Sequence, residues 1–167
     1  MYFDQLAGRK EVQFDWSKFT WIGTPEQTEF VLIMRTDNPY KSIEDIRKAA
    51  VPPKCGATGT STSGYYIPKF LDEGMGIKFN IVTGYPGGGE IDLGIERGEL
   101  QCRNLTISTY FAREPFLTWH KNGFVRPIMQ TSRKRDARVA DVPTIYELMD
   151  QYKTSEINRR VATVLLA

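Results

Sequence analysis

The chain has 167 residues, of which 41% are hydrophobic and 25% are charged, and its formal net charge is +2. This composition is typical of one globular domain and excludes a disordered chain. No apolar run approaches the roughly 20 residues that a membrane span requires. The densest basic run, residues 132–138, contains an acidic residue and no aromatic one, so we read it as a solvated turn and expect no nucleic-acid partner.

The two cysteines, Cys55 and Cys102, stand 47 positions apart and fit no metal-ligand spacing. With His120 as the single histidine, we expect no zinc site. Each cysteine is predicted to be a small buried apolar residue, and a disulfide between them stays an open alternative. No nucleophile motif accompanies His120, which we expect on the surface near a helix end. The sequence therefore predicts a non-enzymatic protein without a metal or a cofactor.

The first elements in chain order are predicted from apolar and capping patterns. Residues 19–23 are short, aromatic and β-branched, which favours a strand. Residues 28–36 form a nearly continuous apolar run, which is typical of a strand buried on both faces. Ser42 is then expected to cap a helix, with Asp45 three residues on in a pattern close to a capping box.

The rest of the chain alternates short strands with helices. Further strands are expected at residues 54–57, 77–82, 100–105 and 124–131. Helices are expected over residues 62–71, 90–98 and 155–167, with a turn into a helix at 141–149 and two short helical pieces between 109 and 123. Pro127 in the last strand indicates an edge or an irregular site. The alternation predicts the α/β class, with an open mixed, mostly parallel sheet flanked by helices.

The end of the chain carries an apolar helical face, formed by Ile157, Val161, Val164 and Leu165. An apolar helix end needs a surface to cover it. We therefore expect either that the chain is truncated there or that this helix packs back on the domain. No secretory leader is recognised at the beginning, so either the protein stays in the cytoplasm or its natural start is missing.

The stretch CGATGTSTSG, residues 55–64, holds three glycines and five hydroxyl residues between a predicted strand and a predicted helix. In an open α/β sheet, ligands bind where strand ends meet helix N-termini, whose free N–H groups attract anions. A second glycine-rich loop, residues 83–89, would lie at the same edge. Glycines let a ligand approach the backbone, and hydroxyls add donors. The hydroxyl residues are Thr58, Thr60, Ser61, Thr62 and Ser63.

Three interpretations compete for this stretch. A phosphate loop of the Walker type is excluded, because Tyr65 stands where the lysine is required. A dinucleotide fingerprint fails on its glycine spacing. Simple capping of a helix explains one or two of the hydroxyls and stays an alternative to anion binding.

Four segments resemble a known family in order and spacing. They are FTWIG followed by EFVLIMRTDNPYKSIEDIRKAA, then CGATGTSTSGYYIPKFL, then GIKFNIVTGYPGGGEIDLGIERGEL, and finally KRDARVADVPTIYEL. They look like the solute-binding receptors of tripartite tricarboxylate transporters, over roughly Phe14 to Leu148. The resemblance implies the second lobe of a type II periplasmic binding protein. Such receptors hold an organic anion between two lobes, and family members are longer at both ends.

The resemblance also implies a division of the chain and a set of ligand residues. Residues 1–36 would be a partial first-lobe segment with hinge strands, 37–131 the ligand-binding lobe, and 132–167 a truncated return toward the first lobe. The family's ligand turn aligns with Ala57 to Ser63, and its second loop with Tyr85 to Gly89. Many members have Asp where this chain has Gln101. Ligand contacts are thus expected from Thr58, Gly59, Thr60, Ser61, Thr62, Ser63, Tyr85, Pro86, Gly87, Gly88, Gln101 and Arg103.

Arg103 lies on the same strand face as Gln101, because side chains alternate along a strand. Its guanidinium could pair with a ligand carboxylate or with a neighbouring Asp or Glu of the protein. Both alternatives stay open from the sequence.

The expected function is that of an extracytoplasmic receptor, or a fragment of one, which binds a small organic carboxylate for a tripartite transporter. Its partners would be that solute and the transporter's membrane components, and the full-length protein would be periplasmic. An enzyme or regulatory domain for a phosphorylated or nucleotide ligand is the alternative. A third hypothesis is a domain without a ligand. Self-association through an exposed apolar lobe face is also expected.

Overall fold

A computed structural model describes residues 2–6, 8–23 and 28–166 and centres on a five-stranded sheet of order β3-β2-β4-β1-β5. The strands are β1 (Phe30–Arg35), β2 (Lys54–Gly56), β3 (Asn80–Val82), β4 (Cys102–Thr106) and β5 (Val125–Gln130). Strand β2 is parallel to β3 and β4, whereas β1 is antiparallel to β4 and β5. Four strands therefore share one direction, which confirms the predicted open mixed, mostly parallel sheet.

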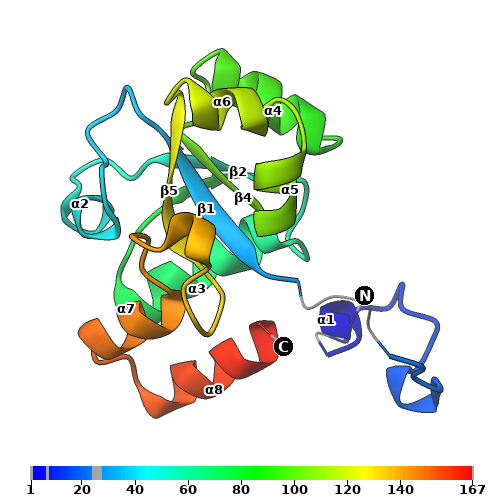
Figure 1. The fold of residues 1–167 in the computed structure, drawn as a ribbon. Coiled ribbons are helices and arrows are strands. Elements are labelled where there is room, and N and C mark those ends of the chain that lie inside the picture. Colours follow the sequence, from blue (N-terminus) through cyan, green and yellow to red (C-terminus); the bar gives the residue numbers. More distant parts are fainter. Residues whose placement is uncertain (1, 7, 24–27, 167) are drawn as a thin grey trace.

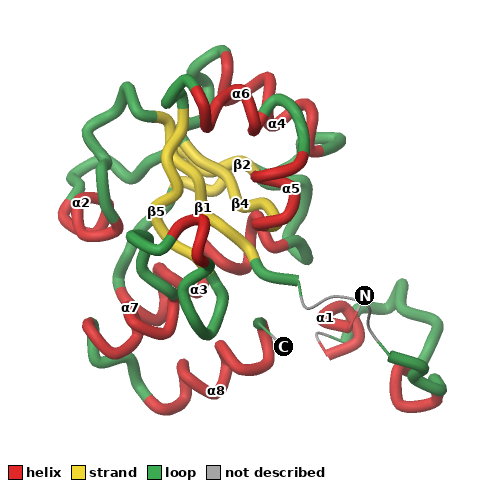
Figure 2. Tube along the Cα trace, in the orientation of Figure 1, coloured by secondary structure: helices red, strands yellow, loops and turns green. Residues whose placement is uncertain are grey.

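Helices cover both faces of the sheet (Figure 1). The described helices are α1 (Tyr2–Leu6), which lies apart from the sheet, and α2 (Ile43–Lys48), α3 (Ser63–Met75), α4 (Gly88–Glu96), α5 (Ile107–Ala112), α6 (Phe116–Lys121), α7 (Ile145–Gln151) and α8 (Glu156–Leu165), with 3-10 turns at Trp16–Lys18 and Ala137–Val139. Figure 2 shows the strands in the middle and the helices outside them. Within the described part of the chain, every helix is too short or too polar to cross a bilayer.

Strand β1 divides the hydrophobic core into two clusters. Val31, Leu32, Ile33 and Met34 have no exposed surface. Because side chains alternate along a strand, Leu32 and Met34 join the cluster beneath α2, α3 and α7, whereas Val31 and Ile33 join the cluster beneath α4, α5 and α6. This confirms the prediction of a strand buried on both faces.

The direction of β1 brings both of its neighbouring chain segments to one edge of the sheet. Phe30 is opposite Thr106, the last residue of β4, and Val31 is opposite Gln130, the last residue of β5. The chain therefore enters β1 and leaves β5 at the edge where β2, β3 and β4 also end. We call this the carboxyl edge of the sheet.

Gln130 anchors the segment that leaves β5, and it is fully buried. Its side-chain amide donates to the carbonyls of Val139 and Val142, and its side-chain oxygen accepts from Ser132 Oγ and from the Asp136 backbone N–H. These four bonds satisfy a buried amide completely and hold the return segment against the sheet.

Two sequence predictions of strands need correction. Residues 19–23 do not form a strand; instead the rings of Phe14, Trp16, Phe19 and Trp21 pack on one another, with Trp16 and Trp21 stacked at 4.6 Å. Strand propensity needs a pairing partner, and here aromatic packing competes with it. Strand β3 begins at Asn80 and not at residue 77. Pro127 lies in edge strand β5, as predicted, and the register shifts beside it.

The predicted division of the chain remains a prediction. Strand β1, which the division assigns to the hinge segment, lies inside the same sheet as β2 to β5. The C-terminal helix α8 packs back through Ala162, which is fully buried, while Ile157, Val161 and Val164 on its outer face are exposed. Figure 1 shows the end of α8 near α1, beside the sheet.

Candidate functional site

The hydroxyl-rich turn, residues 57–62, connects the end of β2 to the start of α3 at the carboxyl edge. Its first residue, Ala57, donates its N–H to the Val82 carbonyl at the end of β3, at 2.9 Å. The turn and the loop after β3 therefore begin side by side. Residues Thr58 to Ser63 are partly exposed or exposed, so their hydroxyls lie at the surface of this edge.

The start of α3 lacks the side-chain cap that the capping hypothesis requires. Thr62 is the N-cap residue, but its side chain accepts no N–H of the helix. Its hydroxyl instead donates to the Gly59 carbonyl at 2.7 Å, which braces the turn. The first N–H groups of this 13-residue helix thus receive no acceptor from the N-cap side chain, and an anion can take that place.

The glycines of this stretch have two different roles. A Cβ on Gly56 would lie 2.6 Å from Leu100 Cδ1, and one on Gly64 would lie 3.2 Å from Ala57 Cβ. Both flanking glycines therefore permit close packing. A Cβ on Gly59 would meet nothing within 4 Å among the described residues, so the middle of the turn is open.

A carboxylate of the chain itself already lies against the turn. Ser61 Oγ donates to Asp4 Oδ1 at 2.6 Å. Arg9 donates to Thr60 Oγ1 at 2.7 Å, and its Nε lies 3.3 Å from the same Asp4 oxygen. The segment around α1 thus lies over two of the predicted ligand hydroxyls.

The second predicted loop leads into α4 on the opposite face of the sheet. Gly87 is the N-cap residue and supplies no side-chain cap, so α4 also begins without one. Pro86 is exposed, whereas Tyr85 packs partly buried against the cluster beneath α4. Helices α3 and α4 therefore start from neighbouring strand ends on opposite faces, which is the arrangement of ligand crevices in open α/β sheets.

Arg103 forms an internal ion pair. Its guanidinium bonds Asp92 of α4 and donates to the Gly88 carbonyl at 2.8 Å, and it lies 5.6 Å from the centre of the Phe116 ring. Burial raises the pKa of Asp92, although the Arg103 charge opposes that shift. Of the two alternatives for Arg103, the structure shows pairing with a neighbouring Asp. The pair lines a surface cavity of about 460 Å³ between α4 and α5.

Gln101 lies just before β4, at the opposite edge of the sheet from the turn. Its side-chain oxygen accepts the Lys54 N–H at 2.8 Å, at the beginning of β2. The structure therefore starts the turn and the second loop side by side, at Ala57 and Val82, and it brings Arg103 to Gly88 of the second loop. It does not bring Gln101 to either loop.

Sequence reasoning missed three residues near the turn. Asp4 and Arg9 are more than 50 positions away from Thr60 and Ser61, so no local pattern connects them. The third is Asn104 on β4, which is 5% exposed and donates to the Ser63 carbonyl at the start of α3. Its side-chain oxygen is buried without a hydrogen-bond partner among the described residues. Asn104 stands among other polar residues in the strand sequence CRNLT, so no sequence signal distinguishes it.

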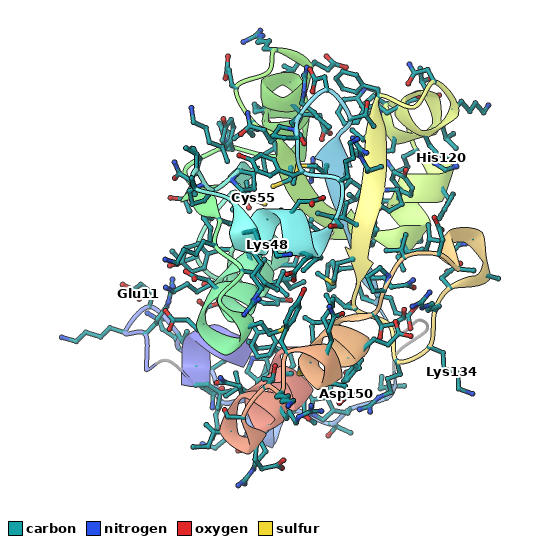
Figure 3. All side chains as sticks on the ribbon, turned by 90° about the vertical axis from the view of Figure 1, so that its left-hand side faces the viewer. Glu11, Lys48, Cys55, His120, Lys134 and Asp150 are labelled. Atoms are coloured by element: carbon teal, nitrogen blue, oxygen red, sulfur yellow. The ribbon has the colours of Figure 1, made fainter. Side chains whose placement is uncertain are left out.

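His120 is exposed at the end of α6, as predicted, and its Nδ1 lies 2.9 Å from the Tyr110 hydroxyl. Burial raises the pKa of Tyr110 to about 12. Figure 3 shows His120 and Lys134 on one side of the molecule and Glu11 on the opposite side. Among the described residues, no three His, Cys, Asp or Glu side chains gather as a metal site.

Comparison with known proteins identifies the family. The family described as the tripartite tricarboxylate transporter family receptor, TctC, matches residues 9–165. The chain belongs to this family. A search of curated proteins found no match.

Solved structures share the fold at low sequence identity. A TctC solute-binding protein from Polaromonas, without ligand, is 18% identical, with a TM-score of 0.59 over 87% of this chain and 57% of that one. MatC from Rhodopseudomonas palustris with bound malate is 16% identical, with a TM-score of 0.57 over 83% and 51%. An R. palustris protein with adipate is 18% identical, with a TM-score of 0.56 over 84% and 50%. This chain therefore spans about half the length of these relatives, and its fold is that of type II periplasmic binding proteins.

Proposed function

We propose that this chain is the ligand-binding lobe of an extracytoplasmic receptor that holds a small organic carboxylate for a tripartite transporter. The ligand's carboxylate would lie at the start of α3 and accept hydrogen bonds from Thr60, Ser61 and backbone N–H groups. The chain binds and does not catalyse. Its partners would be the solute and the membrane components of the transporter, and its compartment would be the periplasm.

The contact between Ser61 and Asp4 is the observation that carries this proposal. It supports the proposal because a carboxylate oxygen of the chain lies 2.6 Å from a hydroxyl of the turn, beside a helix that begins without a side-chain cap. Charge-assisted hydrogen bonds of this kind are stronger than neutral ones. A free carboxylate that displaces Asp4 would find the same donors in place.

The carboxyl edge also supports a two-lobe receptor. The chain enters β1 and leaves β5 at the edge that carries the turn. Segments that connect to a second lobe would therefore flank the ligand, as they do in a hinged receptor. The ligand roles of Tyr85, Pro86, Gly87 and Gly88 belong to this proposal. The roles of Gln101 and Arg103 stay predictions, since other groups of the chain engage both side chains.

A thermal-shift screen tests the ligand class. Succinate, malate, adipate, citrate, benzoate, inorganic phosphate and ATP would be compared at equal concentration and ionic strength. Ligands that bind only the folded state raise its melting temperature, so we expect a rise with at least one carboxylate. Stabilisation by ATP or phosphate and by no carboxylate would refute the proposal in favour of a nucleotide or phosphate domain.

The double substitution Thr60→Ala with Ser61→Ala tests the location. Each lost hydrogen bond to a charged group is worth about 1.5–3 kcal/mol, so affinity for the carboxylate found in the screen should fall at least about tenfold. Thr118→Ala, which removes an exposed hydroxyl on α6, is the matched control and should leave affinity unchanged. Unchanged affinity in the double variant would place the ligand elsewhere.

Self-association is a separate part of the proposal. Ile157, Val161 and Val164 form an exposed apolar face on α8, and Trp21 and Ile22 are exposed near the beginning of the chain. Exposed apolar patches favour association. Sedimentation at increasing concentration should show dimers, and the change Val161→Lys should reduce them; a monomer at all concentrations would contradict this part alone.

A further inference from the structure

Cys55 and Cys102 lie directly opposite each other in the sheet. Cys55 on β2 is the register partner of Cys102 on β4. Neighbouring strands lie about 4.8 Å apart, which falls within the Cα separation that a disulfide requires. Register partners on adjacent strands carry their side chains on the same face, and both cysteines belong to the cluster beneath α3.

The two thiols are close to each other and fully buried. Both cysteines have no exposed surface and are unpaired in the structure. Cys102 Sγ lies 3.6 Å from the carbonyl of Lys54, the residue just before Cys55. Burial, followed by the adjacent Cys55 side chain, raises the pKa of the Cys102 thiol well above its usual value. A thiol that stays protonated is a poor nucleophile, which protects Cys102 from reaction, and burial keeps reagents away from both sulfur atoms.

We propose that Cys55 and Cys102 form a disulfide while the chain folds in an oxidising compartment, before the core closes over them. One thiolate attacks a disulfide oxidant such as oxidised glutathione, forms a mixed disulfide and releases one reduced glutathione. The other cysteine then attacks the protein sulfur of that mixed disulfide and releases the second glutathione. Two protein thiols are thereby oxidised and one glutathione disulfide is reduced to two thiols.

The bond would join the two strands that lead to the site. Cys55 stands two residues before Ala57, where the turn begins, and Cys102 lies on the strand that carries Asn104. The chemistry does not depend on the ligand. Formation of the disulfide in the cell rests on the extracytoplasmic location proposed above. The test below uses a defined oxidant, so its result does not depend on that location.

An order-of-addition experiment tests the proposal. Unfolded, reduced protein is refolded with oxidised and reduced glutathione, or is refolded first and then given the same mixture. Each sample is quenched, unfolded without reductant and alkylated for intact mass measurement. We expect refolding with glutathione to give a monomer two hydrogens lighter and without alkyl groups. The protein folded beforehand should take up two alkyl groups.

Thermal unfolding provides the second readout. The linked protein should melt about 5–10 °C higher than the same protein in reductant, because the bond closes a long loop in the unfolded chain. The pair of changes Cys55→Ala with Cys102→Ala should melt at one temperature with and without reductant. Two alkyl groups on the protein refolded with glutathione, or linkage only between molecules, would overturn the proposal and leave the receptor function untouched.

Discussion

The starts of α7 and α3 show two different ways of beginning a helix in one molecule. At α7, the Thr144 side chain accepts the Glu147 N–H while the Glu147 carboxylate accepts the Thr144 N–H. Helix α2 begins with the same reciprocal box between Ser42 and Asp45. Helices α3 and α4, which start at the carboxyl edge, have no side-chain cap at Thr62 or Gly87.

The missing side-chain caps mean that α3 and α4 are less stable at their first turns than a capped helix would be. An N-cap side chain is worth about 1 kcal/mol, and α3 forgoes it although hydroxyl residues surround its first turn. The short helix α6 also begins without a side-chain cap, at Pro115, so the lack of a cap alone does not mark a site. At α3 the uncapped start coincides with an open turn and with a carboxylate already bound to Ser61.

The largest expected effect is a loss of folding stability when Gly56, packed against the core beside the turn, is replaced, compared with Gly59 in the open middle of the turn. Gly56→Ala would drive a Cβ to 2.6 Å from Leu100 Cδ1 and 2.8 Å from Ile91 Cγ2 in the core. Overpacking of this kind costs about 1–3 kcal/mol, measured as the free energy of unfolding in urea. Gly59→Ala, with open space around its Cβ, is the control and should stay within about 0.5 kcal/mol. Equal losses would remove the distinction between the two glycines.

The next effect compares the two helix starts directly. Thr144→Ala removes a buried cap and should lower the free energy of unfolding by about 1–2 kcal/mol. Thr62→Ala removes only the hydroxyl that donates to Gly59, so it should cost about 0.5–1 kcal/mol. Chemical denaturation measures both values. A larger loss at Thr62 than at Thr144 would mean that α3 is capped after all.

A smaller effect, on ligand affinity, is expected from changing Asp4, which lies against the uncapped start of α3. Asp4→Asn weakens an internal competitor for the turn, so affinity for the carboxylate found in the thermal-shift screen should rise about fivefold, measured by calorimetry. Glu11→Gln removes an exposed negative charge from the same segment and is the matched control. A fall in affinity for Asp4→Asn would show that Asp4 helps to bind the ligand and does not compete with it.

The smallest effect concerns pH at the capped helix. The Thr144 backbone N–H and then Arg135 hold the pKa of Glu147 below its usual value. A depressed carboxyl pKa stabilises the fold above the unfolded pKa of about 4.3, and this stabilisation is lost as pH falls through the folded pKa. Glu147→Gln should therefore reduce the loss of stability between about pH 5 and 3. The same slope in both proteins would contradict the role of the charged cap.

The sequence predicts correctly those helices and strands that are determined by residues close together in the chain. The apolar run of β1 and the spacing of Ser42 and Asp45 predict a buried strand and a capped helix, and the structure confirms both. The strand predicted at residues 19–23 is wrong because β-propensity does not supply a pairing partner. The position of the hydroxyl-rich turn follows from its place between a strand and a helix.

The site could be predicted only in part, because the residue pattern of a strand gives the face on which a side chain lies but not its three-dimensional neighbours. Alternation of side chains predicts which face of β4 carries Gln101 and Arg103, but not which end of the strand faces a ligand. Gln101 lies at the amino end of β4, and Arg103 pairs with Asp92. The contact between Asp4 and Ser61 joins residues 57 positions apart. Such contacts arise from tertiary structure, and no local pattern reveals them.

The placement of the three tryptophans has an optical consequence. Trp16 and Trp21 are stacked at 4.6 Å with an interplanar angle of 15° in the segment that precedes β1, and Trp21 is 63% exposed. Trp119 is buried in α6, on the sheet. Two parallel indoles at this distance couple their electronic transitions, whereas an isolated buried indole emits from apolar surroundings. Circular dichroism in the near ultraviolet would therefore respond mainly to the stacked pair in the leading segment. The short-wavelength part of the tryptophan emission would respond mainly to Trp119 on the sheet.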